Sequence, residues 1–354
     1  MNPGTARSHL RRMRMKQWKN PRILALFQDS CLDPQPRAPG GKTGLQTLAI
    51  ARMDFLRSHE KLLLSRAVDA LEALAALELR ELEGIILRSL NSEVWNPAAC
   101  IERARRDEEF LERRGVVFMK AEDPGYPPQL RETYRPPFGL YVRGRLPDPS
   151  KPCIALVGTR AATGRGLRAA FCLAEELSAK GIPVVSGLAL GIDSAAHRGA
   201  LSGRAKTLAV LPGGMDSVYP ASNRSLAARI LDEGGCLVTE NPPETQIRRY
   251  RFPERNRIIA GLARSCVVVE APEGSGALIT AEHALSEGRD VFVHRACLGG
   301  SRNSGCAALL EQGAIAVAKA CDVFAEWASC GGRSPAFATV GRKEDQKEEM
   351  KLHG

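Results

Sequence analysis

The most constraining feature of this chain is a repeated pattern beyond residue 152, in which a short apolar run is followed by a turn and a helix-like segment. The apolar runs lack the polar alternation of a strand that has one face in solvent. Such strands, each followed by a helix, predict an α/β fold whose parallel sheet is covered on both faces. The expected strands cover 154–158, 183–187, 207–211, 236–240, 266–270 and 291–293. The expected helices cover 167–180, 194–201, 226–233, 256–262 and 277–287.

The rest of the chain predicts smaller units around this sheet domain, which we place at residues 151–327. Residues 1–44 mix basic residues with Pro and Gly and have no period, which predicts a flexible basic arm. Residues 45–114 have apolar positions at helical spacing, which predicts a small helical domain. The prolines of residues 115–150 exclude a helix and favour an extended linker or edge segment. Residues 328–354 are expected to be a polar tail.

Composition excludes several classes of protein. The 354 residues are 44% hydrophobic and 25% charged, which is typical of a soluble globular protein. The formal net charge is +10, but residues 1–44 hold nine basic and two acidic residues and so supply seven of these charges. Net charge therefore says little about the partners of the remaining chain. Because no run of about 18 apolar residues is present, we expect no membrane span, and no apolar segment of a secretory signal follows the basic N-terminus.

The ten cysteines are scattered without a C-x-x-C pair, and several lie inside apolar runs such as the one that begins at Cys266. This distribution is typical of thiols that serve as small core residues in a reducing compartment. We therefore expect a cytoplasmic protein without a zinc site.

Polar and glycine-rich sequence follows four of the expected strands. The ligands of parallel sheets bind beyond the carboxyl ends of the strands, and glycine lets a ligand approach the backbone closely. The four strand ends are Gly158-Thr159-Arg160, Ser186-Gly187, Gly213-Gly214, and Glu270 with the following Ser275-Gly276. The alternative interpretation of each glycine is a tight turn.

A cluster of guanidinium groups lies between Arg248 and Arg257, where five arginines accompany a single acid, Glu254. Phe252 lies within the cluster. Arginines hold phosphates by forked hydrogen bonds, and an aromatic ring stacks a base, so the segment predicts a phosphate-rich ligand such as single-stranded nucleic acid. The alternative is a solvated basic loop before a helix.

Two further patterns suggest other chemistry. The run from Gly164 through Gly166 to Ala169 matches a dinucleotide fingerprint, but it begins six residues after its strand, and the second strand lacks a ribose-binding acid, which argues against NAD. Asp193 and His197 are four residues apart and could act as an acid–base pair. Their alternative functions are a helix cap and an ordinary hydrogen bond. We expect no catalytic residue, cofactor or metal.

Residues 153–317 resemble the DprA/Smf family of DNA-processing proteins. Several motifs carry the resemblance in matching order and spacing over more than a hundred residues. They are Val157–Arg160, Val185–Asp193 with His197, Ala209–Gly214, Tyr219–Asn223, Phe252–Gly261 and Val269–Ala281. The resemblance implies an extended Rossmann-like domain with a doubly wound, mostly parallel sheet. It also implies a non-catalytic homodimer that binds and protects single-stranded DNA and helps to load the RecA recombinase during natural transformation of competent cells.

The resemblance assigns Arg160, Arg249 and Phe252 to the DNA-binding pocket, together with Arg255, Asn256 and Arg257 of the same motif. Physical reasoning agrees, because the arginines would neutralise phosphates and Phe252 would stack a base. Further candidate DNA contacts come from the strand ends and the arginine cluster. They are Gly158, Thr159, Ser186, Gly187, Gly213, Gly214, Arg251, Ser275 and Gly276.

The chain departs from the family pattern after its last expected core strand, where it has His294-Arg295 in place of a Pro-Gly pair. Many relatives also end in a winged-helix module, which we do not expect here, and carry a sterile-alpha-motif-like domain where this chain has residues 45–114. An alternative function is a phosphoribohydrolase-like nucleotide-processing enzyme of related fold, suggested by Pro212-Gly213-Gly214 and Glu270. Such an enzyme would not need the arginine-rich segment.

Overall fold

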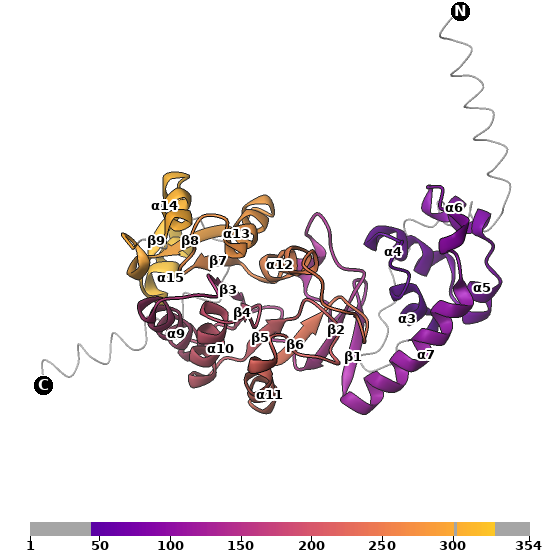
Figure 1. Ribbon diagram of the computed structural model, residues 1–354, viewed down its shortest axis with the longest axis horizontal. Helices are drawn as coiled ribbons and strands as arrows, with labels where there is room; N and C mark the ends of the chain where they lie inside the picture. Colours follow the sequence, from indigo (N-terminus) through magenta and orange to yellow (C-terminus); the bar gives the residue numbers. More distant parts are fainter. Residues whose placement is uncertain (1–43, 301–302, 330–354) are drawn as a thin grey trace, which may run out of the picture.

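The computed structural model describes residues 44–300 and 303–329. Nearly all of the expected N-terminal arm and of the expected polar tail lies outside the described residues. Within them, nine strands form one sheet in the order β1-β2-β6-β5-β4-β3-β7-β8-β9 (Figure 1). Strands β3 to β9 are parallel, whereas β2 pairs antiparallel with β6, and β1 with β2. The predicted α/β fold with a mostly parallel sheet is therefore confirmed.

The strand order reverses beside β3, and this reversal determines where a ligand can bind. The strands are β1 (Val116–Lys120), β2 (Gly139–Gly144), β3 (Ile154–Val157), β4 (Val184–Ser186), β5 (Thr207–Val210), β6 (Cys236–Thr239), β7 (Ser265–Val268), β8 (Asp290–His294) and β9 (Ile315–Val317). The chain runs from β3 through β4 and β5 to β6 on one side, and continues from β7 to β9 on the other. A crevice beyond the carboxyl ends of the strands forms at such a switch point.

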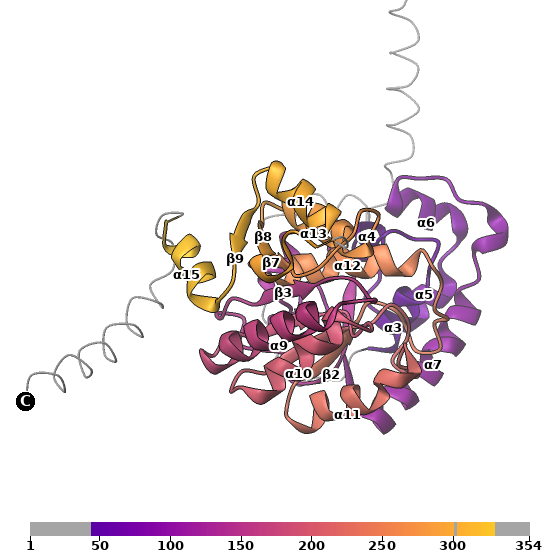
Figure 2. The same cartoon turned by 60° about the vertical axis from the view of Figure 1, so that its left-hand side comes forward.

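Helices cover both faces of the sheet (Figure 2). One face carries α9 (Gly164–Ala179), α10 (Ile192–Ser202) and α11 (Arg224–Asp232), and the other carries α12 (Arg251–Leu262), α13 (Gly276–Ser286) and α14 (Ser304–Glu311). Strand β3 shows why: Ile154 and Leu156 pack in the cluster that contains Leu173 of α9, whereas Ala155 and Val157 pack in the cluster that contains Ile258 of α12. Both faces of each strand are thus apolar, which explains the uninterrupted hydrophobic runs.

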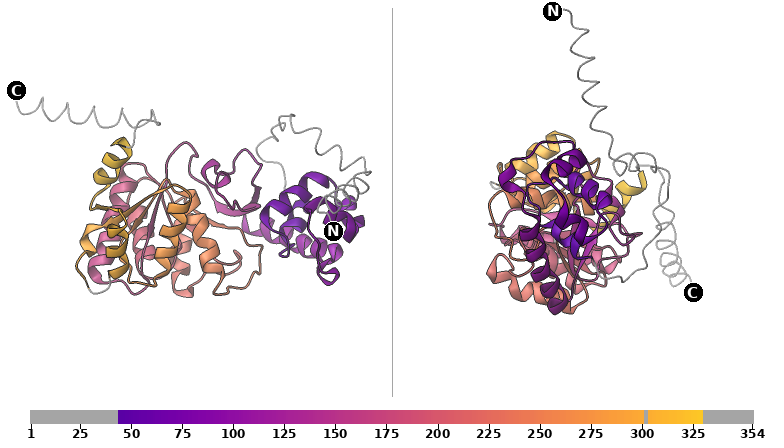
Figure 3. Two further views of the ribbon diagram at one scale, coloured as in Figure 1. Left: turned by 90° about the horizontal axis from the view of Figure 1, so that it is seen from above. Right: turned by 90° about the vertical axis from the view of Figure 1, so that its right-hand side faces the viewer.

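A bundle of short helices lies at one end of the molecule, beyond β1 and β2 (Figure 3). Its helices are α3 (Leu45–Ala51), α4 (Ser58–Ala67), α5 (Leu71–Ala76), α6 (Leu79–Ile86) and α7 (Pro97–Arg114), with a 3-10 turn η1 (Ser92–Val94). The Asn96 side chain caps α7 by accepting a bond from the Ala99 amide at 2.9 Å. The buried Arg52, which follows α3, donates from its Nε to Asp107 of α7 at 2.6 Å and from a terminal nitrogen to the Pro243 carbonyl at 2.9 Å. The bundle is therefore joined to a loop of the sheet domain.

The proline-rich segment between the bundle and the sheet forms the sheet's antiparallel edge, β1 and β2. It also contains α8 (Pro128–Arg131), although its prolines were expected to exclude a helix. The expectation was wrong because Pro128 occupies the first turn, where its missing amide hydrogen has no intrahelical partner to lose. Tyr126 is buried beside α8 and donates its hydroxyl to the Pro137 carbonyl at 3.1 Å.

The sequence His294-Arg295, where the family usually has Pro-Gly, begins a 3-10 turn, η3 (Arg295–Cys297). His294 Nε2 lies 3.1 Å from the Ala318 carbonyl, and Arg295 Nε donates to the Ala316 carbonyl at 2.9 Å. These bonds attach the turn to β9 and the segment before α15 (Ala320–Ser329). Neither β9 nor α15 was among the expected elements.

The buried cysteines behave as core residues. Cys236 and Cys266 are fully buried in β6 and β7, and burial raises the pKa of the Cys266 thiol to about 12. Among the described residues, no helix has the length and apolar character needed to cross a membrane.

Candidate nucleic-acid interface

The turn after β3 presents Arg160 at the switch point of the sheet. The Thr159 amide donates to the Glu270 carbonyl at 2.7 Å, and the Thr159 carbonyl accepts from the Ile192 amide at 3.3 Å. These bonds anchor the turn between the β7 end and the start of α10. The Arg160 side chain remains exposed beyond them.

Arg160 lies over the ring of Phe252, with its Cζ 4.8 Å from the ring centroid. Tyr219 meets the same ring at 65° with a centroid separation of 5.8 Å. The three side chains line a small pocket of about 40 Å³ together with Gly187, Leu190 and Arg255. Phe252 comes from the first turn of α12, so two predicted contributors from separate segments of the chain, Arg160 and Phe252, are in contact at one site.

The chemistry of this pocket suits an unpaired base and its phosphate. Phe252 is half-buried and Tyr219 is exposed, so a base that enters can stack without unfolding the site. A guanidinium held over an aromatic ring gains only about 0.5–1 kcal/mol at an exposed position. Arg160 can therefore leave the ring at small cost and bind a phosphate by a forked pair of hydrogen bonds.

Arg249 lies in the loop before α12 and is exposed. Its carbonyl accepts from the Phe252 amide at 3.3 Å, which places the Arg249 backbone next to the aromatic ring. Arg248, also exposed, donates to the Gln246 side chain at 3.0 Å. Within the described ranges, neither arginine has an ion pair, so both charges are open to a ligand.

Arg255, in contrast, is buried beneath the pocket. Its Nη1 donates to the Gly187 carbonyl at 2.5 Å and to the Val210 carbonyl at 2.7 Å, which joins the ends of β4 and β5. A Cβ at position 187 would collide with the guanidinium, so glycine is required there. Burial lowers the pKa of Arg255 to about 10, and the nearby Asp193 opposes that shift. Its hydrogen bonds hold the fold together, and it adds positive potential from below.

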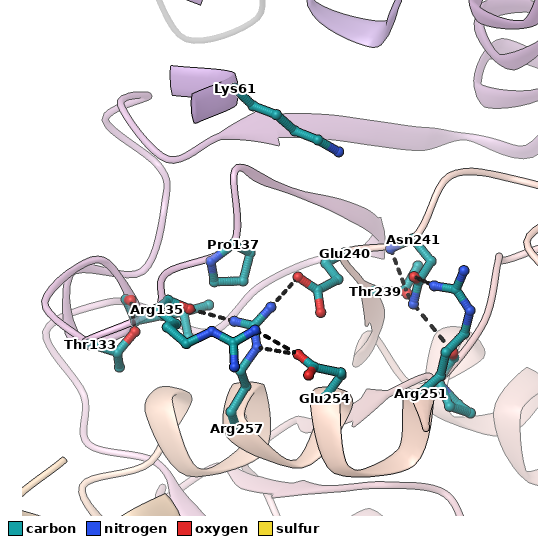
Figure 4. Close-up of polar contacts among 12 residues, drawn as sticks. Lys61, Thr133, Arg135, Pro137, Thr239, Glu240, Asn241, Arg251, Glu254 and Arg257 are labelled. Atoms are coloured by element: carbon teal, nitrogen blue, oxygen red, sulfur yellow. Dashed lines mark hydrogen bonds and ion pairs between the residues drawn. The ribbon is translucent and has the colours of Figure 1, made fainter. Parts of the chain in front are cut away.

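The remaining residues of the arginine-rich motif point elsewhere. Arg257 pairs with Glu240, lies 3.5 Å from Glu254, and donates to the Arg135 carbonyl (Figure 4). Arg251 donates to the Asn241 side chain (Figure 4). Asn256 donates to the Gly276 carbonyl at 3.1 Å. The structure therefore does not bring these side chains into the pocket with Arg160, although the sequence placed them in one motif.

Several predicted strand-end contacts lie within the fold. Ser186 is fully buried and donates to the Leu156 carbonyl at 2.7 Å. Loop 242–247 covers Gly213 and Gly214, because an added Cβ would lie 2.7 Å from Ile247 and 2.8 Å from the Pro242 carbonyl, respectively. Ser275 caps α13 by accepting from the Ala277 amide, and Gly276 is exposed. Gly158 and Thr159 are partly exposed beside Arg160, whereas Gly187 lines the pocket.

The acid–base pair does not form. Asp193 accepts from the Gly187 amide at 3.1 Å and the Ala189 amide at 3.3 Å. His197 Nδ1 lies 2.8 Å from Thr207 Oγ1, and complete burial lowers the pKa of His197 to about 3. His197 is therefore a neutral core residue. Asp193 is structural as well, but the expected helix cap was wrong, because Gly191 is the N-cap of α10 and Asp193 binds loop amides instead.

Glu270, which suggested a hydrolase, is fully buried and accepts from the Thr163 hydroxyl at 2.8 Å. The backbone of the dinucleotide-like run also closes on this carboxylate, since a Cβ at Gly166 would collide with it. With Gly213 and Gly214 covered, the geometry favours a binding site over this hydrolase alternative.

Tyr219 was not among the predicted site residues, although it completes the aromatic wall of the pocket. A signal was present, because Tyr219 is an aromatic residue shortly after the Gly213-Gly214 strand end and belongs to one of the family-like motifs. Sequence alone could not show that this loop returns over α12.

The fold and this pocket define an extended Rossmann-like protein whose strand ends present cations and aromatic rings instead of a dinucleotide cradle. The chain belongs to the family described as DNA recombination-mediator protein A, whose model matches residues 117–328. The predicted resemblance to the DprA/Smf proteins is thereby confirmed.

Curated relatives agree with this assignment. The chain is 40% identical over 234 residues to Protein Smf of Escherichia coli, which covers 66% of this chain and 62% of that protein. It is 38% identical over 214 residues to DNA processing protein DprA of Bacillus subtilis, covering 60% of this chain and 72% of that protein. The chain thus spans less than two thirds of the length of the Escherichia coli relative.

Two solved structures share the fold. DNA processing protein A from Streptococcus pneumoniae superimposes with a TM-score of 0.66 at 33% identity, covering 81% of this chain and 99% of that chain. DNA processing protein A from Helicobacter pylori gives a TM-score of 0.53 at 26% identity, covering 60% of this chain and 100% of that chain. The Helicobacter pylori protein is described as having a unique mode of binding single-stranded DNA.

Proposed function

We infer that this protein binds single-stranded DNA at the pocket formed by Arg160, Phe252 and Tyr219, and acts as a recombination mediator without turnover. The proposal rests on the contact between Arg160 and Phe252. It brings an exposed guanidinium that can bind phosphate next to a ring that can stack a base, at the switch point of the sheet. Arg249 supplies a second exposed cation, and Arg255 adds positive potential from beneath.

The biological function that we propose follows the family. The protein would protect incoming single strands in the cytoplasm, help to load RecA during natural transformation, and work as a homodimer. Membership of the recombination-mediator family and the single-strand binding of the Helicobacter pylori relative support this proposal. A measurement of RecA filament formation on single-stranded DNA, with and without the protein, tests the RecA step directly.

The pocket is tested by the double substitution Arg160→Glu/Arg249→Glu. Retention of labelled oligo(dT) in a gel-shift assay should be abolished, because the two new carboxylates repel the phosphates that the arginines would bind. For the milder pair Arg160→Ala/Arg249→Ala, the slope of log affinity against log salt should fall by about 1.4, which is about 0.7 for each phosphate on a single strand.

A control at a distant exposed arginine is Arg204→Glu, because Arg204 lies just before β5 and so at the amino ends of the parallel strands, away from the pocket. It should bind oligo(dT) like the wild type. Unchanged binding by the Arg160→Glu/Arg249→Glu protein, with an unchanged melting temperature, would remove the pocket assignment. Release of free base from nucleoside monophosphates at enzymatic rates would favour the hydrolase alternative instead.

A further inference from the structure

A second and larger cleft lies between the helical bundle and the sheet domain, with a volume of about 680 Å³. Arg57 and Lys61, at the start of α4, form one wall. The opposite wall comes from residues 240–242 and from the first turns of α12, and Lys61 extends toward it (Figure 4). The volume is within the range of about 300–1,000 Å³ that is usual for ligand sites.

The cleft has an excess of positive charge. Five cations line it, namely Arg57, Lys61, Arg135, Arg251 and Arg257, against the three carboxylates Asp54, Glu240 and Glu254. Glu240 pairs with Arg257, and Glu254 is shared between Arg257 and Arg135. Two of the three acids are therefore neutralised within the wall itself.

The other cations face neutral partners. Lys61 Nζ donates to the Ala51 carbonyl at 2.7 Å, and Arg251 donates to the Asn241 amide oxygen. Arg57 is exposed. In the part of the chain that the structure describes, none of these three makes an ion pair. Burial lowers the pKa of Lys61, and the carboxylates of Asp54 and Glu240 oppose that shift without forming an ion pair with it. A phosphate in direct contact with this half-buried ammonium would stabilise its charged form further.

Aromatic rings complete the cleft. Tyr250 is 61% exposed and Tyr134 is 89% exposed, and both line the cleft. The Cζ of Arg251 lies 5.2 Å from the centroid of the Tyr250 ring. Exposed rings beside unpaired cations are the combination that binds single-stranded nucleic acid.

The cleft and the Phe252 pocket adjoin across a single helical turn. Arg251 and Glu254 line the cleft, whereas Phe252 and Arg255, their neighbours in sequence, line the pocket. A strand that leaves the pocket over the start of α12 therefore meets the cleft next.

We propose that this cleft binds the nucleotides that adjoin the base held at Phe252, with phosphates at Lys61, Arg57 and Arg251 and bases on Tyr250 and Tyr134. The inference rests on the proposed function, because it extends the path of the same strand. If the cleft binds DNA, the helical bundle contacts the strand directly, and the number of nucleotides that the protein binds depends on the bundle.

The test compares labelled oligo(dT) of about 4 and about 16 nucleotides, the limits of site size for a small single-strand module. Binding is followed by fluorescence anisotropy over a salt series. For Arg57→Glu/Lys61→Glu, affinity for the long oligonucleotide should fall roughly tenfold, and its salt slope by about 1.4, as expected for two lost phosphates. Affinity for the short oligonucleotide should stay unchanged.

The matched control is Arg80→Glu/Arg105→Glu, which makes the same charge change at exposed positions on α6 and α7. It should bind both oligonucleotides like the wild type. Arg57→Glu alone is included because the exposed Arg57 side chain can change without disturbing the bond from Lys61 to Ala51, and Lys61→Arg should retain binding.

The outcomes separate this inference from the proposed function. If the wild type binds neither oligonucleotide, both are overturned. If Arg160→Glu/Arg249→Glu abolishes binding while Arg57→Glu and Arg57→Glu/Lys61→Glu bind the long oligonucleotide normally, only the cleft inference is overturned.

Discussion

The two halves of the arginine-rich segment 248–257 differ in exposure and in hydrogen bonding. Arg249 is exposed and the half-buried Phe252 contacts Arg160, whereas Arg255, one turn further along α12, is buried and donates to two carbonyls. Arg257 is held by acids. A count of guanidinium groups therefore does not measure ligand binding, because a guanidinium that already donates to acceptors within the protein stabilises the fold instead.

The largest expected effect contrasts Arg255 with Arg160. Arg255→Ala leaves two carbonyls without their donor and the nearby buried Asp193 without a compensating charge, so we expect a loss of about 3–5 kcal/mol in the free energy of unfolding. Arg160→Ala should unfold like the wild type, since its side chain is exposed. Urea denaturation of the two variants measures this difference, and equal stabilities would contradict the structural role of Arg255.

An effect of intermediate size, on DNA affinity, is expected for Phe252. Phe252→Ala should weaken oligo(dT) binding by about 1–3 kcal/mol, because it removes a stacking surface. Phe252→Tyr keeps the ring and should bind nearly as well. Titration by anisotropy distinguishes them, and a Phe252→Ala protein with wild-type affinity would show that the ring is not a base platform.

The smallest effect concerns His197, which lies in the buried layer near Arg255. Its pKa of about 3 in the folded protein is below the usual value of about 6.5, so the unfolded chain binds the proton between these values. Stability from this group is complete above about pH 6.5 and falls as the pH drops toward 3, by about 1 kcal/mol between pH 7 and 5.5.

Urea denaturation at both pH values measures this loss in the wild type. His197→Gln should lack that share of the pH dependence, while its DNA affinity at neutral pH should be retained. Identical pH profiles for the two proteins would mean that His197 binds its proton equally well in the folded and the unfolded protein, which would contradict its lowered pKa.

Much of the fold followed from local pattern. The apolar runs predicted the six strands β3 to β8, since both faces of each are buried, and the family-like motifs placed Arg160 and Phe252 at one site. Strands β1 and β2 were expected only as extended chain, because they lie in the proline-rich segment outside the strand–helix repeat. Strand β9, which has three residues, was not expected.

Local residue patterns were enough to predict the α/β class, the family and a cationic, aromatic segment at the strand ends. They did not indicate which of those cations face outward. Arg255 and Arg257 differ from Arg249 because carbonyls and carboxylates from distant segments, such as Gly187 and Glu240, accept hydrogen bonds from them. The position of such partners depends on how the whole chain packs, which no local pattern records.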